Sequence, residues 1–412
     1  MLSAEENELL TRVYPDSRMG NLFRRYWIPA LLAEEIPEPD GAPVRVRLLG
    51  EDLVAFRDTS GRIGLLDEHC AHRGTSLFFG RNEECGLRCI YHGWKYDIEG
   101  NVLDTPAEPP DSQLKYKVHH IAYPCVEAGG MVFAYMGPKD KMPVFPAYAW
   151  LGVPQNQIYI AKSLLECNYL QALDGDCDSS HLNFLHRMFK PDERRSFLVH
   201  DQAPEFEIDE MEFGFRVAAI RKTAPDTNYV RISHFVMPFI GCVPVGREID
   251  GKLDGFKAVY QVPADDHTTW RYDFFFKWSR PMTKEDSSKR DFVGPGYRKI
   301  RNLGNNYLQD RKVQKRVNFT GIEEFLNQDA CATESMGPIV DRTKERVGVS
   351  DSYVIQVRRF LLKALTDVEA GKAPPGVIYD TAKADFSGIR CDVAHLPANV
   401  SWRTLFEEKA NG

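Results

Sequence analysis

Long apolar stretches are missing from this sequence, and none is long enough to span a bilayer. The N-terminus, Met1 to Glu8, is acidic and no apolar segment follows it, so we expect neither a secretory signal nor a membrane anchor. Cationic residues are also a minority, because 52 lysines and arginines face 59 aspartates and glutamates, for a net charge of -7. Neither nucleic acid nor an anionic membrane surface is therefore an expected partner.

Cysteine is sparse as well, with nine residues scattered through 412. This odd number in a long chain does not fit the disulfide framework of a small secreted protein, so we predict free thiols in a reducing cytoplasm. Cys70 and Cys89 differ from the other seven because a histidine follows each at short spacing.

The length predicts two domains, since 412 residues exceed what one hydrophobic core usually supports. Residues 139–154 are rich in proline and aromatics without a clear period, which is typical of a linker. We therefore expect one domain over residues 1–150 and a second over residues 151–412.

Hydropathy patterns predict mainly β structure, with helices concentrated in the second domain. Short alternating runs separated by turn residues predict antiparallel hairpins at 44–48, 53–56 and 63–66, with a further strand at 130–136. In the second domain we expect a mainly helical region at 164–189, a large antiparallel sheet from 205–222, 228–245 and 256–278, a polar loop at 283–316, and a helix at 351–369 with Ser350 as N-cap and Gly371 after its end.

Two short motifs in the first domain combine thiol and imidazole: Cys70-Ala71-His72 and Cys89-Ile90-Tyr91-His92. The sixteen residues between them, 73–88, are enough for a hairpin that brings the two loops face to face. Thiolate and imidazole suit both iron and zinc. A zinc site of two cysteines and two histidines is the alternative, but C-x-H is an unusual zinc spacing and is the spacing of Rieske 2Fe-2S clusters.

The second domain contains the pattern D-x2-H-x4-H, formed by Asp178, His181 and His186. On a regular helix His186 would lie about 140° from His181, so the two imidazoles converge only if the helix is distorted or ends between them. Two histidines and one carboxylate can hold a mononuclear Fe(II) and leave positions open for O2 and substrate. Spacing alone leaves the third ligand open among five downstream acids: Glu323, Glu324, Asp329, Glu334 and Asp341.

The residues around these motifs resemble a known family. His72-Arg73-Gly74 and the run from His92 to Asp97 are similar to the Rieske domains of bacterial ring-hydroxylating oxygenases. With the opening segment 19–29 and the segment 334–343, nearly the whole chain resembles the oxygenase component of Rieske non-haem iron oxygenases. The resemblance is greatest to the phthalate dioxygenase-like group of aromatic-acid oxygenases and O-demethylases.

The resemblance implies an α+β fold, in which an all-β N-terminal Rieske domain precedes a helix-grip catalytic domain of curved antiparallel sheet and helices. It implies Asp329 as the third ligand of the mononuclear iron. It also implies a homo-oligomer, a trimer or hexamer, in which Asp178 bridges a Rieske histidine of one subunit to an iron histidine of the next. A helix N-cap is the alternative role for Asp178.

The implied activity is hydroxylation of an aromatic carboxylic acid with O2, by phthalate-like ring dihydroxylation, and O-demethylation of a methoxylated aromatic acid is the alternative. A Rieske electron carrier without oxygenation is a remote alternative. Electrons would come from NAD(P)H through a separate flavin and iron-sulfur reductase, because Gly294-Pro295-Gly296 lacks the spacing of a nucleotide loop. A substrate carboxylate requires a fixed cation, and the candidates on predicted strands are Arg221, Arg231 and Arg247.

Overall fold

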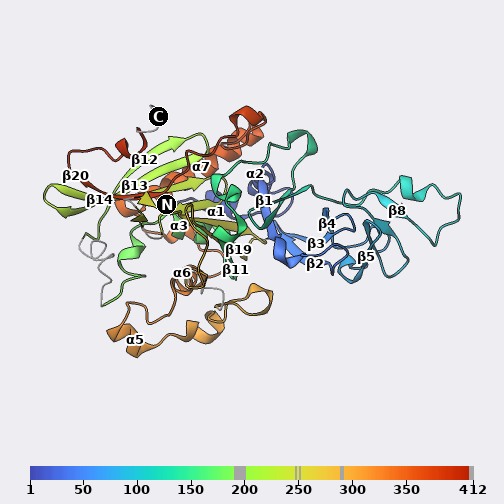
Figure 1. Ribbon diagram of the computed structural model, residues 1–412, viewed down its shortest axis with the longest axis horizontal. Helices are drawn as coiled ribbons and strands as arrows, with labels where there is room; N and C mark the ends of the chain where they lie inside the picture. The colour runs from blue at the N-terminus through green and yellow to red at the C-terminus, as the bar shows by residue number, and fades with distance from the viewer. Residues whose placement is uncertain (190–200, 246–247, 250–251, 288–291, 408–412) are drawn as a thin grey trace.

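The computed structural model describes residues 1–189, 201–245, 248–249, 252–287 and 292–407. Figure 1 shows an elongated molecule with two bodies: β2 to β5 and β8 lie at one end, and the long sheet strands with α7 form the larger body at the other. Among the described residues, no helix is both long and apolar enough to cross a membrane.

The first body is built from three small antiparallel sheets, as the short alternating runs predict. In the first sheet β10 (Met131–Tyr135) lies between β1 (Trp27–Leu32) and β9 (Cys125–Ala128). The second is the meander β2 (Val44–Leu48), β3 (Glu51–Arg57) and β4 (Ile63–Asp67). The third is β5 (Arg81–Glu83), β6 (Gly86–Arg88), β7 (Lys95–Tyr96) and β8 (Val102–Asp104).

The second body contains an eight-stranded antiparallel sheet in the order β11-β19-β18-β15-β14-β13-β12, with β20 paired to β14. Its strands are β11 (Ile158–Leu165), β12 (Glu205–Met211), β13 (Gly214–Ala224), β14 (Thr227–Val236), β15 (Ile240–Val243), β18 (Lys257–Pro263), β19 (Thr269–Phe276) and β20 (Asp392–Pro397). A separate hairpin pairs β16 (Glu248–Ile249) with β17 (Lys252–Leu253). Together with the helices below, these sheets confirm the predicted α+β class.

Each long alternating segment of the second body forms a hairpin within that sheet. Met211 pairs with Gly214 at the tight turn between β12 and β13, and Val236 pairs with Ile240 across the bend between β14 and β15. Pro263 pairs with Thr269 at the loop between β18 and β19. Alternation continues through such short turns, which explains why hairpins and single strands look alike in the sequence.

The α-helices of the described residues are α1 (Ala4–Thr11), α2 (Arg18–Phe23), α3 (Tyr169–Asp176), α5 (Arg311–Arg316), α6 (Phe325–Glu334), α7 (Ser352–Glu369) and α8 (Thr404–Glu407). Of the candidate metal ligands, Asp329 lies on α6, whereas His181 and His186 follow the end of α3. The predicted helix 351–369 is present, but Asp351 is its N-cap residue instead of Ser350, because a 3₁₀ turn over Val349–Asp351 precedes it.

The region 164–189 is much less helical than predicted. Strand β11 continues to Leu165 and α3 covers only Tyr169–Asp176, after which the chain forms a 3₁₀ turn at His181–Asn183. Asp178 interrupts the helix because its carboxylate accepts hydrogen bonds from the backbone N–H groups of Ser180 (2.6 Å) and His181 (3.2 Å).

The N-terminal helices contact the second body although they precede the first in sequence. The Tyr169 hydroxyl of α3 donates to the Leu10 carbonyl at 2.7 Å, and Asn168 donates to the Thr11 carbonyl at 2.9 Å. Arg18 forms an ion pair with Glu369 of α7. The division into residues 1–150 and 151–412 stays a prediction.

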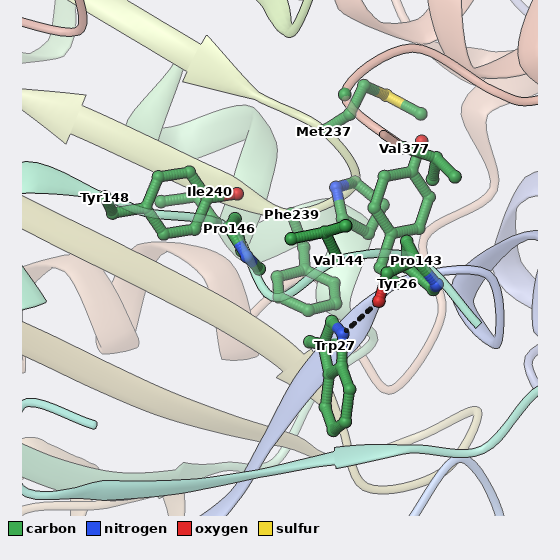
Figure 2. A pocket seen from close by; sticks show the side chains of 12 residues that line it. Tyr26, Trp27, Pro143, Val144, Pro146, Tyr148, Met237, Phe239, Ile240 and Val377 are labelled. Carbon is green, nitrogen blue, oxygen red and sulfur yellow. Dashed lines mark hydrogen bonds between the residues drawn. The ribbon is translucent and has the colours of Figure 1, made fainter. Parts of the chain in front are cut away.

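The seam between the two bodies is tightly packed. Figure 2 shows aromatic and proline side chains converging there from β1, from residues 143–148 and from residues 237–240, with Trp27 Nε1 donating to the Pro143 carbonyl at 3.0 Å. The cavity between them is ≈ 20 Å³, about the space of one water molecule. A second link is the ion pair of Lys162 Nζ with Glu35, at 2.6 Å. The Lys162–Glu35 pair joins β11 of the second body to the segment after β1 of the first.

Candidate metal centres

The two Cys/His motifs fold into loops of the same design. In each, the cysteine N–H donates to the carbonyl five residues later, Thr75 for Cys70 (2.9 Å) and Trp94 for Cys89 (2.8 Å). In each, a glycine N–H donates back to the cysteine carbonyl, Gly74 at 2.8 Å and Gly93 at 3.0 Å. Both glycines have positive φ, +75° and +74°, a conformation that favours glycine.

These matching turns bring the four predicted cluster residues together. Cys70 and Cys89 are buried, whereas His72 and His92 are half-buried, with ring centroids 4.6 Å apart. The His72 ring stacks on Trp94 at 4.7 Å, which fixes its plane. The Tyr96 hydroxyl lies 3.0 Å from Cys70 Sγ. One loop therefore presents a thiol and an imidazole to the other.

The donor set fits a two-iron cluster with cysteine on one iron and histidine on the other. Burial raises the pKa of the Cys89 thiol, and the nearby Cys70 thiol adds to this effect. Burial also lowers the pKa of His92, and the adjacent His72 and Arg73 lower it further. A metal binds the neutral form of an imidazole and the deprotonated form of a thiol, so His92 is held in its binding form, whereas Cys89 would release its proton when a cationic cluster binds.

The second motif converges because α3 ends before it. His181 lies in the 3₁₀ turn, and the Leu185 N–H donates to the His181 carbonyl at 2.8 Å, which directs the chain toward α6. His186 Nε2 then lies 2.9 Å from Asp329 Oδ1 on α6, and His181 Nε2 lies 4.0 Å from the same oxygen. Among the described residues, His181, His186 and Asp329 form a set of three potential metal ligands whose donor atoms all lie within 4.8 Å of one another.

Hydrogen bonds orient these groups before any metal binds. His186 Nδ1 lies 2.7 Å from Gln328 Oε1, so Nδ1 carries a proton and Nε2, which faces Asp329, is the nitrogen that would bind a cation. Burial alone would raise the pKa of Asp329, but His186 and Arg271 outweigh burial and hold that pKa well below its usual range. Asp329 is thus a carboxylate, facing two imidazoles. This donor set fits a ferrous ion.

Asp178 combines two sets of contacts. Its carboxylate accepts the two backbone N–H groups described above, and Oδ2 also lies 3.7 Å from His181 Nδ1. Burial would raise its pKa, but the neighbouring His181 lowers it, so the group is ionised. Asp178 is not a helix N-cap, because the N-cap residue of the 3₁₀ turn is Ser180; its carboxylate instead holds the backbone before His181 and faces the imidazole that a bridge would use.

The other four acids considered for the third ligand point elsewhere. Glu334 is buried against Lys299 Nζ (2.5 Å) and the Tyr307 hydroxyl. Glu323 pairs with Arg301, and Asp341 bonds Thr343 at the surface. Glu324 is exposed at the start of α6.

The three predicted arginines have different environments. Arg221 on β13 is fully buried and donates to the Ser179 carbonyl (2.8 Å) and Asn183 Oδ1 (3.2 Å), both in the segment of the two histidines. Burial, and then the nearby Arg231, lower the pKa of Arg221 to about 10. Arg231 donates to the Pro244 carbonyl at 3.2 Å, and Arg247 lies outside the described residues.

His234 is a core residue. It bonds the Arg390 carbonyl at 3.0 Å, and burial lowers its pKa to about 3, so it stays neutral.

Sequence reasoning missed the side chains that support the ligands, Gln328, Arg271 and Asp273. Arg271 and Asp273 are charged, buried and two residues apart, on one face of the otherwise apolar strand β19. Such a pair inside a hydrophobic strand is a signal that could have been noticed.

A pair of Rieske-type loops in a β body, followed by a His/His/Asp cluster under a large antiparallel sheet, defines the class of two-centre iron oxygenases. Family comparisons agree: residues 26–125 match the Rieske [2Fe-2S] domain, and residues 134–411 match the family described as LigXa C-terminal domain like. The chain belongs to the Rieske oxygenases, in the phthalate dioxygenase-like group, and is an oxygenase component.

Relatives over the full length carry related names. The chain is 42% identical to the phthalate 4,5-dioxygenase oxygenase subunit of Pseudomonas putida, over 98% of this chain and 94% of that protein. It is 38% identical to the 3-chlorobenzoate-3,4-dioxygenase oxygenase subunit of Comamonas testosteroni, over 100% of this chain and 99% of that protein. It is 31% identical to the 5,5'-dehydrodivanillate O-demethylase oxygenase subunit of a Sphingobium strain, over 100% of this chain and 91% of that protein.

Solved structures share the fold at low identity. The Pseudomonas putida NdmA structure with caffeine aligns with a TM-score of 0.63 at 20% identity, over 86% of this chain and 94% of that one. Dicamba monooxygenase bound to dicamba aligns with a TM-score of 0.61 at 15% identity, over 85% of this chain and 99% of that one. Members of this family hold a Rieske cluster and a mononuclear iron, and as an oxygenase component the chain requires a separate reductase.

Proposed function

We propose that this oxygenase hydroxylates an aromatic carboxylic acid, with O2 and with NAD(P)H-derived electrons delivered by its reductase. One observation carries the choice of an acid: Arg221 is fully buried, and no carboxylate of the described residues lies within ion-pair distance of it. Its partners are neutral oxygens of Ser179 and Asn183.

A buried charge with no counter-ion among the described residues is costly, because removing one partner of a buried ion pair typically destabilises a protein by about 3–5 kcal/mol. A substrate carboxylate would supply the compensating charge, and a guanidinium can bind it through two parallel hydrogen bonds. Ser179 and Asn183 flank His181, so an acid held by Arg221 would lie beside the candidate iron site. The phthalate and chlorobenzoate relatives support the same substrate class.

In this proposal Cys70, His72, Cys89 and His92 hold the 2Fe-2S cluster. His181, His186 and Asp329 hold Fe(II), which when bound activates O2 beside the substrate with an electron from the Rieske centre. The chain's own residues orient these groups: Gln328 sets the tautomer of His186, and Asp178 holds the backbone that carries His181.

We further infer a head-to-tail homo-oligomer, a trimer or hexamer, in which Asp178 links the two centres of neighbouring subunits. Figure 1 draws β5 in the cluster body and α6 in the larger body, apart from each other. Apolar side chains are exposed at both centres, Ile90 and Tyr91 on a cluster loop, and Phe184 and Phe319 beside the iron segment. Exposed apolar patches of this kind are typical of subunit contacts. The nine free cysteines support a reducing cytoplasm.

The test is turnover of phthalates, chlorobenzoates and methoxylated benzoates with a surrogate reductase and NADH, followed by mass spectrometry of the products. We expect a hydroxylated product from an aryl acid and none from its methyl ester. Formaldehyde from a methoxybenzoate would identify O-demethylation as the reaction. Equal turnover of acid and ester would contradict the role of the carboxylate.

The variant Arg221→Gln sharpens this test. It should weaken aryl-acid binding about 10-fold or more, since hydrogen bonds to charged groups contribute about 1.5–3 kcal/mol. Arg216→Gln is the matched control, because Arg216 lies on the opposite face of the same strand, over the Phe406 ring at 4.0 Å. Unchanged acid affinity in the folded Arg221→Gln protein would contradict the assignment.

A further inference from the structure

A charged network lies beneath the candidate iron site on the face of β18 and β19. Arg271 is 4% exposed and Asp273 is 0% exposed, in a strand whose other residues are apolar, aromatic or threonine. Arg271 donates two hydrogen bonds to the Asp273 carboxylate, from Nε to Oδ2 at 2.8 Å and from Nη2 to Oδ1 at 3.1 Å. Lys257 Nζ from β18 lies 3.0 Å from the same Asp273 carboxylate. Taking these charged groups out of water costs free energy that their mutual attraction does not always offset.

One atom of this network reaches the ligand set. Arg271 Nη2 donates to Asp329 Oδ2 at 3.4 Å, whereas Asp329 Oδ1 lies 2.9 Å from His186 Nε2. The two oxygens of one carboxylate therefore have different partners. Oδ1 faces the imidazoles and Oδ2 faces the guanidinium.

We propose that Arg271 is a positioning residue that occupies Asp329 Oδ2, so that Asp329 offers a single oxygen, Oδ1, to the mononuclear metal. This inference rests on the proposed ligand role of His181, His186 and Asp329. A carboxylate limited to one oxygen leaves one more coordination position free than a carboxylate that binds through both. The remaining coordination positions on the metal are those left open for O2 and substrate.

Two effects of Arg271 on a metal oppose each other. Its positive charge repels a cation, but Asp273 offsets part of that charge through the paired hydrogen bonds, although Lys257 shares the same carboxylate. Its hydrogen bond orients Asp329 before the metal arrives, and removing groups that orient metal ligands typically costs about 10–100-fold in metal affinity. We therefore expect orientation to dominate.

Lys257 provides a matched control within the same network. It contacts Asp273, as Arg271 does, but among the described residues its ion pair is with Asp273 and not with Asp329. Lys257→Met removes one cation from the network without touching the ligand, whereas Arg271→Met removes both a cation and the bond to Asp329. A merely structural network would make the two variants alike.

The experiment is titration of the cluster-containing protein, stripped of its mononuclear metal, with Co(II), whose visible absorption reports coordination number. Arg271→Met should bind Co(II) about 10-fold more weakly than wild type, with weaker absorption as Asp329 binds through both oxygens. Lys257→Met should retain the wild-type spectrum. Arg271→Lys, which keeps the charge and one donor, should recover most of the spectrum and guards against misfolding of the methionine variant.

Two outcomes would overturn the inference in distinguishable ways. If wild type binds Co(II) and folded Arg271→Met shows the same affinity and spectrum, the positioning role is wrong while the iron site stands. If wild type and His186→Ala give identical titrations, the proposed iron site itself is wrong and the role of Arg271 falls with it.

Discussion

The two candidate metal centres of this chain use similar side chains but are assembled in different ways. The cluster loops are two copies of one short turn, each closed by a cysteine, a glycine of positive φ and a carbonyl five residues from the cysteine. The iron site joins the end of α3 to the side of α6, and its supporting contact between His186 and Gln328 spans 142 residues. The contacts that shape the first centre lie within a few residues of its ligands. The contacts that shape the second centre join segments of the catalytic body that are far apart in the sequence.

This difference decides what a mutation should do at each centre. A change in a cluster loop acts within a few residues, because the turn holds its own ligands. A change near the iron acts through contacts between α3, α6 and β19, and supporting residues there matter as much as ligands. The following predictions separate the two centres, from the largest expected effect to the smallest.

Substitutions of the metal ligands should have the largest effects on turnover, and variants of the two centres should differ in visible absorption. Cys89→Ser should abolish both turnover and the red-brown absorption of the cluster, because a hydroxyl does not replace a buried thiolate ligand. His186→Ala should abolish turnover but keep the absorption, because its imidazole lies in the other centre. Visible spectra and product assays of the two proteins provide the check. A colourless His186→Ala protein would mean that the centres are not separate.

Asp178→Asn should lower turnover by up to about 100-fold while iron content and absorption stay normal. The amide keeps an oxygen that can accept the N–H groups of Ser180 and His181 but lacks the charge facing His181. Asp341→Asn is the matched control, because the Asp341 carboxylate also accepts the N–H two residues later, from Thr343, and is exposed at the surface. If both variants turn over normally, Asp178 only holds the local backbone.

Gln328→Leu should weaken binding of the mononuclear iron about 10-fold, because His186 loses the acceptor that holds its Nδ1 proton. Gln328→Glu retains an acceptor at the same place and should restore much of the affinity. Iron titration of protein with an intact cluster measures both variants. Equal affinity in Gln328→Leu and wild type would remove Gln328 from the description of the site.

The smallest effects should distinguish the twin loops from each other. Gly74→Ala should destabilise the cluster by about 1 kcal/mol, the usual cost of a side chain at positive φ. Gly93→Ala should cost more, since its Cβ would lie 2.7 Å from Pro106 Cγ, whereas nothing lies within 4 Å of a Cβ at Gly74. Urea-induced bleaching of the cluster absorption ranks the two variants. The reverse order would contradict the predicted clash of residue 93 with Pro106.

The same contrast explains how far the sequence predicts this molecule. The cluster loops, the hairpins at 44–66 and the amphipathic helix after Ser350 are set by local patterns, and the structure agrees with them apart from a one-residue shift of the helix N-cap. The pattern of Asp178, His181 and His186 predicts a helix that is distorted or ends between the two histidines, whereas α3 ends earlier, at Asp176, so the motif lies beyond the α-helix.

The rest could not be predicted because it depends on contacts distant in sequence. Arg271 reaches Asp329 from a strand 58 residues earlier, and Arg221 reaches Ser179 from a strand 42 residues later. Nothing local distinguishes Arg221 from arginines that point to solvent, and although Asp273 marks Arg271 as unusual for its strand, nothing local shows that Arg271 reaches Asp329. Likewise, Leu164 and Leu165 extend a strand that pairs with β19, although their apolar character also fits the helix that the pattern predicts.

The most direct test of the two-centre account is the iron and acid-labile sulfide content of the pure, reconstituted protein. The account predicts three irons and two sulfides per chain, falling to two irons and two sulfides in His186→Ala. Two irons and two sulfides in wild type, unchanged by His186→Ala, would describe a Rieske electron carrier and contradict the account.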